Sequence, residues 1–241
     1  PKPAAKPKRK LSKRAVAAIV MIVFTVPLTI YAGIHFFGDR KYYFISALII
    51  LETMLPFALV FESGKPRARE LVVVAALCAV GVAGRAAFFM LPQFKPVAAL
   101  VIITGIAFGG ETGFLVGAVT TFISNMFFGQ GPLTPWQMFA FGIIGFLAGA
   151  CFHKRNAARS RAAICVFGFL CAFFIYGGIM NPAVMLANQP DPKAAMLLPY
   201  YLQGIPFDLV HSAATVTFLA AAGEPMLEKL DRIKKKYGLV E

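Results

Sequence analysis

Charged residues are scarce in this chain, and acidic residues are scarcer than basic ones. Asp, Glu, Lys and Arg make up only 15% of the 241 residues, with 11 acids against 24 lysines and arginines. The hydrophobic fraction of 59% is well above what a water-soluble core needs. This composition excludes an ordinary soluble domain and predicts an all-α integral membrane protein.

The short motifs of many enzymes are also missing. The sequence has no GxxxxGK[ST] nucleotide loop, no HExxH motif, no paired aspartates for diphosphate and magnesium, and no GxSxG elbow. The acids and histidine that would serve an embedded lipid- or prenyl-processing enzyme are dispersed over four spans, at Glu52, Glu111, Asp208 and His211. We therefore expect a transport subunit rather than an enzyme, driven by a gradient or by a partner that hydrolyses ATP.

Cysteine and histidine are few and scattered. The four cysteines fall inside predicted spans and form no CxxC pair, and the three histidines lack metal-ligand spacing. We predict no structural disulfide, no metal site and no cofactor of the protein's own.

Long apolar runs, by contrast, are abundant. A helix needs about 20 mostly apolar residues to cross the hydrocarbon core. We count eight runs, which are Ala15 to Phe37, Tyr42 to Phe61, Leu71 to Leu91, Val97 to Phe108, Thr112 to Phe128, Gln137 to Phe152, Ala162 to Ile179 and Leu197 to Ala222. The fourth is short, and it crosses only if Gly109 and Gly110 make a tight turn at the membrane surface.

Lysine and arginine are unevenly distributed among the segments that link these runs. Most of them lie in the tails at 1–14 and 225–241 and in the links at 65–69 and 154–161. Because short cytoplasmic loops carry the excess of basic residues, both termini of this multi-pass cell-membrane protein are predicted to be cytoplasmic. Topology and anionic lipid headgroups then account for the net charge of +13, without nucleic-acid binding.

Small residues form a stripe along the run Leu71 to Leu91. Ala75, Ala79, Ala83 and Ala87 are spaced four apart and therefore lie on one face of a helix. Rows of small residues let two helix backbones approach closely in lipid. The stripe is thus a docking surface, either for another helix of this chain or for an external partner.

Ionisable side chains inside the predicted spans are further candidates, because such groups are costly in lipid and are usually paired or functional. Arg85 and Asp208 lie at similar depth in the outer parts of their spans, which allows an ion pair between them. Such a pair either fixes the register of two helices or lines a ligand cavity. Glu52, near the middle of its span, is either a neutral structural group, which we favour, or the proton-coupling acid of a stand-alone carrier.

Two segments predicted at the outer surface are rich in polar and turn-forming residues. The first, SNMFFGQGPLTPWQMF at 124–139, places amides and aromatic rings around a Gly/Pro reversal. The second, NPAVMLANQPDPKAAMLLPYYLQGIP, begins at Asn181 and is unusually long for a connector. Because it mixes apolar and hydrogen-bonding residues, the loop at 181–205 is typical of a lid over a cavity. Together the two segments indicate a ligand site that opens outward.

From Arg69 onward the chain is similar to a known family. The alanine-striped RELVVVAALCAVGVAGRAAF is followed by FKPVAALVIITGIAFGGETGFLVGAVTTFISNMFFGQGPLTPWQMFAFGIIGFLAG and by a six-helix count to the C-terminus. This combination resembles the substrate-binding S-components of energy-coupling factor (ECF) vitamin transporters. The resemblance implies a six-helix substrate-binding core at 67–224. An N-terminal transmembrane hairpin at 15–66, which the family pattern lacks, precedes it.

The resemblance also implies partners and a transport mechanism. Six helices bind a vitamin in an outward-facing pocket closed by extracellular loops. The small-residue stripe, here Ala75 to Ala87, then docks on a transmembrane coupling protein that carries two cytoplasmic ATPases. ATP-driven rearrangement topples the S-component, so that its pocket opens to the cytoplasm. The absence of a nucleotide loop in this chain agrees with that division of labour.

Among the ligands of the family, the chain is most similar to the cobalamin-specific S-components, so vitamin B12 or a related corrinoid is the expected ligand. The amide side chains of a corrinoid suit Asn, Gln and backbone donors better than a charged clamp. Pantothenate, whose carboxylate suits Arg85 or Lys95, is the alternative. The predicted substrate-binding residues are Asn125, Phe128, Gln130, Trp136, Gln137, Arg85, Asp208, Asn181 and Tyr200.

Overall fold

The computed structural model describes residues 25, 28–29, 41–63, 68–153 and 160–238. Within these ranges every regular element is helical, as predicted, and no strand occurs. Apart from Thr25, Leu28 and Thr29, the first predicted span lies outside the described residues. Only the second helix of the predicted N-terminal hairpin is therefore described in full.

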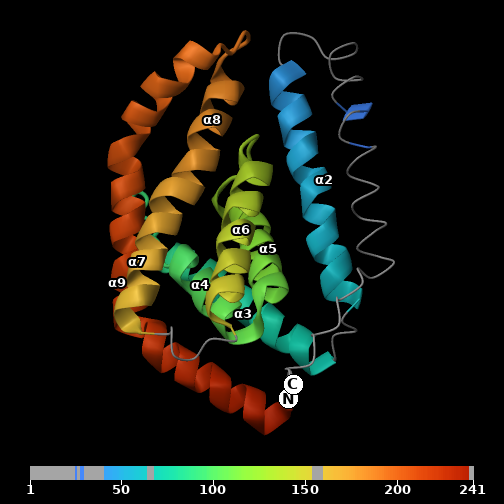
Figure 1. Cartoon of the computed structure of the whole chain (residues 1–241), viewed down its shortest axis with the longest axis vertical. Coiled ribbons are helices and arrows are strands. Elements are labelled where there is room, and N and C mark those ends of the chain that lie inside the picture. The colour runs from blue at the N-terminus through green and yellow to red at the C-terminus, as the bar shows by residue number, and fades with distance from the viewer. Residues whose placement is uncertain (1–24, 26–27, 30–40, 64–67, 154–159, 239–241) are drawn as a thin grey trace, which may run out of the picture.

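The helices pack side by side as a bundle. Figure 1 shows most of them running roughly along the long axis of the molecule, with α8 and α9 on one side and α2 on the other. Their bounds are α2 Lys41–Ser63, α3 Ala68–Ala87, α4 Val97–Phe108, α5 Gly110–Phe128, α6 Thr134–Phe152, α7 Arg161–Leu170, the π-helical turn η2 Cys171–Tyr176, α8 Gly177–Asn188, the 3₁₀ turn η3 Ala194–Met196 and α9 Leu197–Tyr237.

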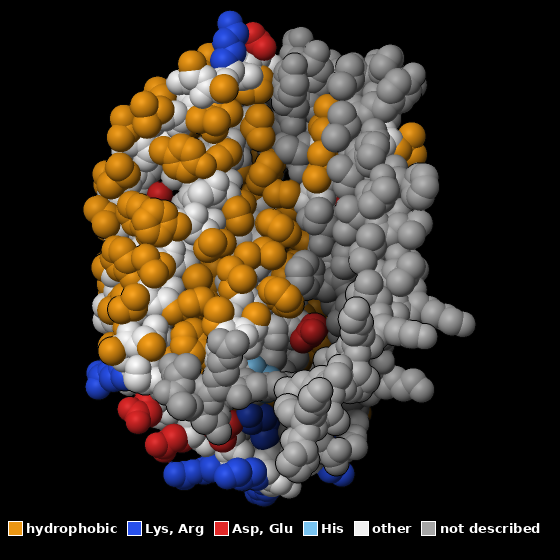
Figure 2. Space-filling model, viewed as in Figure 1, with side chains coloured by type: hydrophobic (Ala, Val, Ile, Leu, Met, Phe, Trp, Pro, Cys, Tyr) orange, Lys and Arg blue, Asp and Glu red, His pale blue; other side chains and the backbone are white. Residues whose placement is uncertain are grey.

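The lengths and surface of these helices suit a bilayer. Among the described residues, four helical segments are long and apolar enough to cross a membrane: Ala68–Ala87, Thr134–Phe152, Arg161–Asn188 and Ala194–Tyr237. Figure 2 shows hydrophobic side chains over one face of α7, α8 and α9, with charged side chains gathered at the end of the molecule where α9 ends. The protein is a multi-pass membrane protein, although the count of eight spans is not confirmed.

The short helix α4 is the centre of the bundle. Its residues from Val97 to Ala107 are all buried, and it packs against α3, α5, α6, α7 and α9. A helix that is apolar on every face is shielded from water either by neighbouring helices or by lipid, and here neighbouring helices enclose it. Gly109, with a φ of 100°, connects α4 directly to α5 at the tight turn that the sequence predicts.

Glycines bring α6 into backbone contact with α4 and α5. A Cβ added at Gly105 of α4 would lie 2.1 Å from the carbonyl oxygen of Gly145 on α6. A Cβ added at Gly145 would lie 2.3 Å from the carbonyl oxygen of Gly113 on α5. Because no side chain fits at these crossings, the three helices form a rigid centre around which the other elements are arranged.

The prediction of a long outer loop at 181–205 is wrong. α8 continues to Asn188, and α9 begins at Leu197 after one 3₁₀ turn. Pro182 lies inside α8, where it cannot supply the N–H that would bond the carbonyl of Gly178. The hydroxyl of Tyr201 on α9 donates to that carbonyl at 3.1 Å instead. Packing of α8 against α9 therefore compensates for the proline.

The last predicted span ends too early. α9 continues past Ala222 to Tyr237, so the segment predicted as a basic tail is helical as far as the structure describes it. Leu227 and Leu230 are buried in the main core cluster. Lys234 Nζ donates to the carbonyl oxygen of Ala107 at 2.7 Å, at the C-terminal end of α4. A lysine in this position satisfies an otherwise unpaired helix-end carbonyl and interacts favourably with the helix dipole.

Candidate functional site

Two adjoining cavities lie among α3, α5, α6, η2, α8 and α9. The smaller, here called the arginine compartment, has a volume of about 150 Å³, and the larger, the amide compartment, has about 500 Å³. The arginine compartment is lined by Arg85, Gln93, Lys95, Val97, Thr121, Ser124, Gln137, Phe141, Tyr176 and His211. The amide compartment is lined by Gln93, Leu133, Gln137, Tyr176, Met180, Asn181, Val184, Asn188, Tyr200, Gln203, Gly204, Phe207 and Asp208. The compartments share the side chains of three residues and therefore form one site.

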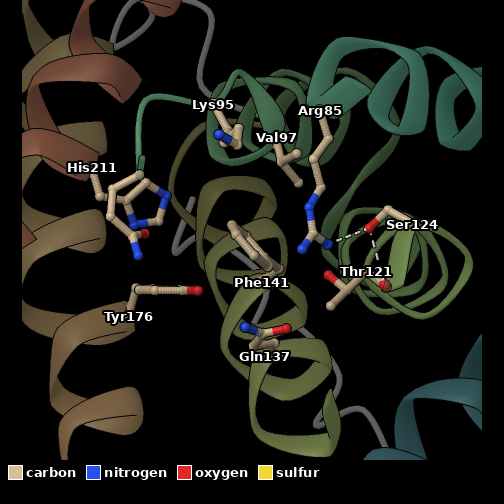
Figure 3. Close-up of a pocket in the computed structure, with 10 residues that line it drawn as sticks. Arg85, Lys95, Val97, Thr121, Ser124, Gln137, Phe141, Tyr176 and His211 are labelled. Atoms are coloured by element: carbon tan, nitrogen blue, oxygen red, sulfur yellow. Dashed lines mark hydrogen bonds between the residues drawn. The ribbon is translucent and has the colours of Figure 1, made fainter. Parts of the chain in front are cut away.

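Arg85, near the end of α3, is held by neutral side chains of α5. Its Nη1 donates to Ser124 Oγ at 2.6 Å and also to Asn125 Oδ1. The amide nitrogen of Asn125 in turn donates to Gln137 Oε1 at 2.9 Å and to Thr134 Oγ1 at 3.0 Å. Asn125, which is only 2% exposed, thus fixes both Arg85 and Gln137 from behind the cavity wall. Figure 3 shows Arg85, Gln137 and Tyr176 directed toward the same space.

Three rings form an aromatic wall of the arginine compartment. The Tyr176 ring lies 4.4 Å from the His211 ring and 4.9 Å from the Phe141 ring, measured between centroids. Tyr176 ends the π-helical turn η2, and such turns often occur at functional sites. His211 is 4% exposed, and its Nδ1 has no hydrogen-bond partner among the residues that the structure describes. An unpaired buried nitrogen at a cavity wall is costly unless something in the cavity bonds it.

The connection between α3 and α4 folds over the cavity. Gln93, which lines both compartments, has a φ of 56°, an uncommon value for a residue other than glycine. Lys95 Nζ donates to the carbonyl oxygen of Phe88 at 2.7 Å and to that of Leu91, which draws the connection into a compact turn. Burial, and then the nearby positive charge of Arg85, lower the pKa of Lys95.

The amide compartment lies between α8 and α9. Asn181 Nδ2 donates to Asp208 Oδ2 at 2.9 Å, and Gln189 Nε2 donates to the Tyr200 hydroxyl at 3.0 Å. Asp208 therefore pairs with an amide, while Arg85 bonds a serine and an asparagine. The ion pair that depth allows between Asp208 and Arg85 does not form.

The structure places several of the predicted substrate-binding residues in the cavity wall. Those that line a compartment are Arg85, Gln137, Asn181, Tyr200 and Asp208. The remaining ones lie behind it or away from it.

Three predicted residues lie away from the cavity lining. Phe128 borders an apolar groove between α3 and α5. Gln130 is exposed and accepts a hydrogen bond from Thr134 Oγ1 at 2.9 Å. Trp136, 8% exposed, packs in a cluster with Ile50 of α2. No signal in the sequence places α2 over this tryptophan.

Sequence reasoning missed Gln93 and Tyr176, which line both compartments. Gln93 lies in the short link between two spans, where a single polar residue attracts no notice. Tyr176 could have been identified from the sequence as a candidate, because the hydroxyl of a tyrosine inside an apolar run needs a hydrogen-bond partner. Its position opposite Arg85 and His211 depends on the packing of η2 and cannot be read from spacing.

The small-residue stripe lies on the outer surface of α3. Ala75, Ala79 and Ala83 are exposed and line a groove of about 720 Å³ between α3 and α5. Ala87 is exposed as well, but Ala86 takes its place in the lining. Among the described residues the stripe is therefore uncovered, so packing within this part of the chain does not account for it.

The fold and the site define a multi-pass helical membrane protein with a solute-sized cavity, lined by aromatic and polar side chains, and an exposed small-residue groove. Residues 69–219 match the family model described as "ECF transporter, substrate-specific component", and the chain belongs to this family. No curated protein matches the chain, and no solved structure does. Membership makes the chain a transport subunit rather than an enzyme, and implies partnership with an ECF module of coupling protein and ATPases.

Proposed function

We propose that the protein captures a vitamin at the outer face of the cell membrane and delivers it inward as the substrate-binding subunit of an ATP-driven ECF importer. The two-compartment cavity carries this proposal. Its volume suits a small molecule, and its wall combines aromatic rings with a few fixed polar groups. All residues that line it fall within the matched range 69–219.

For the ligand, we propose cobalamin or a related corrinoid, which the resemblance of the sequence favours. Amide side chains suit the amides of a corrinoid, and they are concentrated in the amide compartment at Gln93, Gln137, Asn181, Asn188 and Gln203. Contacts of Phe128, Gln130 and Trp136 with the ligand stay predictions from the sequence.

Pantothenate is the second candidate ligand, and the arginine compartment favours it. Two cations, Arg85 and Lys95, border a space of about 150 Å³, which suits a carboxylate. The amide compartment would then receive the hydroxyl- and amide-bearing body of the molecule.

For coupling, we propose that the groove along Ala75, Ala79 and Ala83 receives a helix of the transmembrane coupling protein. Small residues on both sides of such a contact allow the close backbone approach that stabilises helix pairs in lipid. With both termini cytoplasmic, toppling of the docked subunit would expose the cavity to the cytoplasm.

The visible absorption spectrum of the purified protein tests the proposed corrinoid ligand. Protein incubated with cyanocobalamin and then desalted is expected to retain the visible absorption of the corrinoid. Gln137→Ala should weaken that binding about 10-fold through loss of a lining hydrogen bond. The control change Thr217→Ala, at an exposed polar residue of α9 outside both linings, should leave it unchanged. Protein that stays colourless would remove corrinoids as ligands but leave the transport role intact.

A further inference from the structure

Among the residues that the structure describes, the side chain of Arg85 has no acidic hydrogen-bond partner. Its guanidinium bonds Ser124 Oγ and Asn125 Oδ1, both of which are neutral. Among the described residues, the lining of the arginine compartment includes no Asp or Glu. A charge inside a membrane protein is costly unless an opposite charge compensates it. The guanidinium of Arg85 would therefore be stabilised by a negatively charged group bound in the cavity.

Lys95 adds a second cation to the same wall, and it too has no acidic partner in the described part of the chain. Its ammonium group bonds the backbone carbonyls of Phe88, Phe89 and Leu91, which carry no net charge. Both cations line the same compartment, so their like charges repel one another. Burial, and then the charge of Arg85, lower the pKa of Lys95. An anion between or beside them would relieve this repulsion.

Neutral groups in the wall also offer hydrogen-bond donors. Asn125 Nδ2 donates to Gln137 Oε1, so the amide nitrogen of Gln137 remains able to donate into the cavity. His211 is buried, lines the compartment, and has an Nδ1 without a partner in the part of the chain that the structure describes. An imidazole with Nδ1 protonated would donate to an oxygen of a bound anion.

The acidic residue of the cavity lining, Asp208, lies in the amide compartment. Asp208 lines the amide compartment beside Asn181, where hydroxyl or amide N–H groups of a ligand would be its natural partners. The continuous cavity is therefore polarised, with cations at one end and a carboxyl group at the other.

We infer that the arginine compartment is an anion subsite. Arg85, Lys95, Gln137 and His211 bind the negatively charged group of the transported solute, and the amide compartment binds its donor-bearing body. This inference rests on the proposed function. It also fixes the orientation of the bound solute, with the anionic group beside Arg85 and the rest of the molecule between α8 and α9. The anionic group is a carboxylate in pantothenate and a phosphodiester in cobalamin, so the chemistry is shared by both candidates.

Two ligand pairs test the inference by calorimetry on the full chain in detergent. Panthenol replaces the carboxylate of pantothenate with an alcohol, and dicyanocobinamide lacks the phosphodiester-linked nucleotide of cobalamin. The member of each pair that carries the anionic group, pantothenate or cobalamin, is called the anionic member, and the other is called the neutral member. In whichever pair binds the protein, the anionic member should bind the wild type more tightly than the neutral member. Arg85→Gln should weaken the anionic member by about 10- to 100-fold and the neutral member by less than about 3-fold.

Control variants separate charge from folding. Lys193→Gln removes an exposed cation outside the cavity and should change neither affinity. If Arg85→Gln fails to fold, Lys95→Gln, at a position outside the helices, should still weaken the anionic member selectively. Equal losses for both members, or neutral members that bind the wild type as tightly as the anions, would overturn the inference.

The remaining outcomes distinguish the inference from the function on which it rests. Binding of pantothenate identifies a carboxylate ligand, and binding of cobalamin identifies a phosphodiester. If neither anion binds while the chain still assembles with the coupling protein and its ATPases, the anion subsite is refuted but the transport role stands. Failure to assemble with that module would refute the proposed function itself.

Discussion

Replacing Ala79 with tryptophan is expected to weaken assembly of the protein with its coupling partner strongly while leaving solute binding unchanged. Ala79 is exposed, lies in the groove between α3 and α5, and belongs to neither cavity lining. An indole ring in the groove would hold an incoming helix away from the small-residue surface. We expect the complex to weaken by about 100-fold, at the upper end of overpacked contacts. Co-purification of the ATPase module with a tagged chain measures this.

A matched tryptophan tests whether position or bulk is responsible. Ala213 is an exposed alanine of α9, outside the groove, so Ala213→Trp should leave the complex and solute binding intact. Thermal unfolding of both variants should resemble that of the wild type, because neither side chain is buried within this chain. An Ala79→Trp protein that still assembles with the module would show that the partner docks elsewhere.

Properties of single helices were predictable from the sequence. The apolar run Val97 to Phe108 coincides with α4, because Pro96 and Gly109 bound the run and the same residues bound the helix. The spacing of Ala75, Ala79 and Ala83 placed them on one face, which the structure leaves exposed. Because a charged side chain is costly in lipid, Arg85 and Asp208 were predicted to be functional or paired, and both line the cavity.

Properties that arise between helices were not predictable. Pro182 indicates a loop by local rules, yet Tyr201, distant in the sequence, bonds the carbonyl that the proline leaves unpaired. Trp136 beside a Gly/Pro turn suggests a ligand contact, but packing against Ile50 of α2 buries it. The cavity itself depends on where the α3–α4 connection and η2 meet, and Gln93 reaches it only through an unusual backbone angle.

The glycine crossings at the centre of the bundle should tolerate no side chain. Gly145→Ala is expected to destabilise the protein by about 3 kcal/mol, because the added methyl group would meet backbone atoms of α5 that cannot move aside. In detergent, the apparent unfolding midpoint should fall by about 6–12 °C. Val101 of α4, whose Cγ1 would lie 2.7 Å from the new methyl group, can change rotamer, but the carbonyl of Gly113 at 2.3 Å cannot.

Gly223 provides the matched control for this change, because it too is a buried helical glycine but has open space where its Cβ would lie. Gly223→Ala should be neutral or should stabilise α9 by about 0.5–1 kcal/mol, since alanine restricts the unfolded chain more than glycine does. A Gly145→Ala protein as stable as wild type would mean that α5 and α6 can separate without loss. The hydrogen bond from Asn125 of α5, which fixes Gln137 of α6 in the cavity wall, would then not be held rigidly. The preformed cavity on which solute capture depends would lose its physical basis.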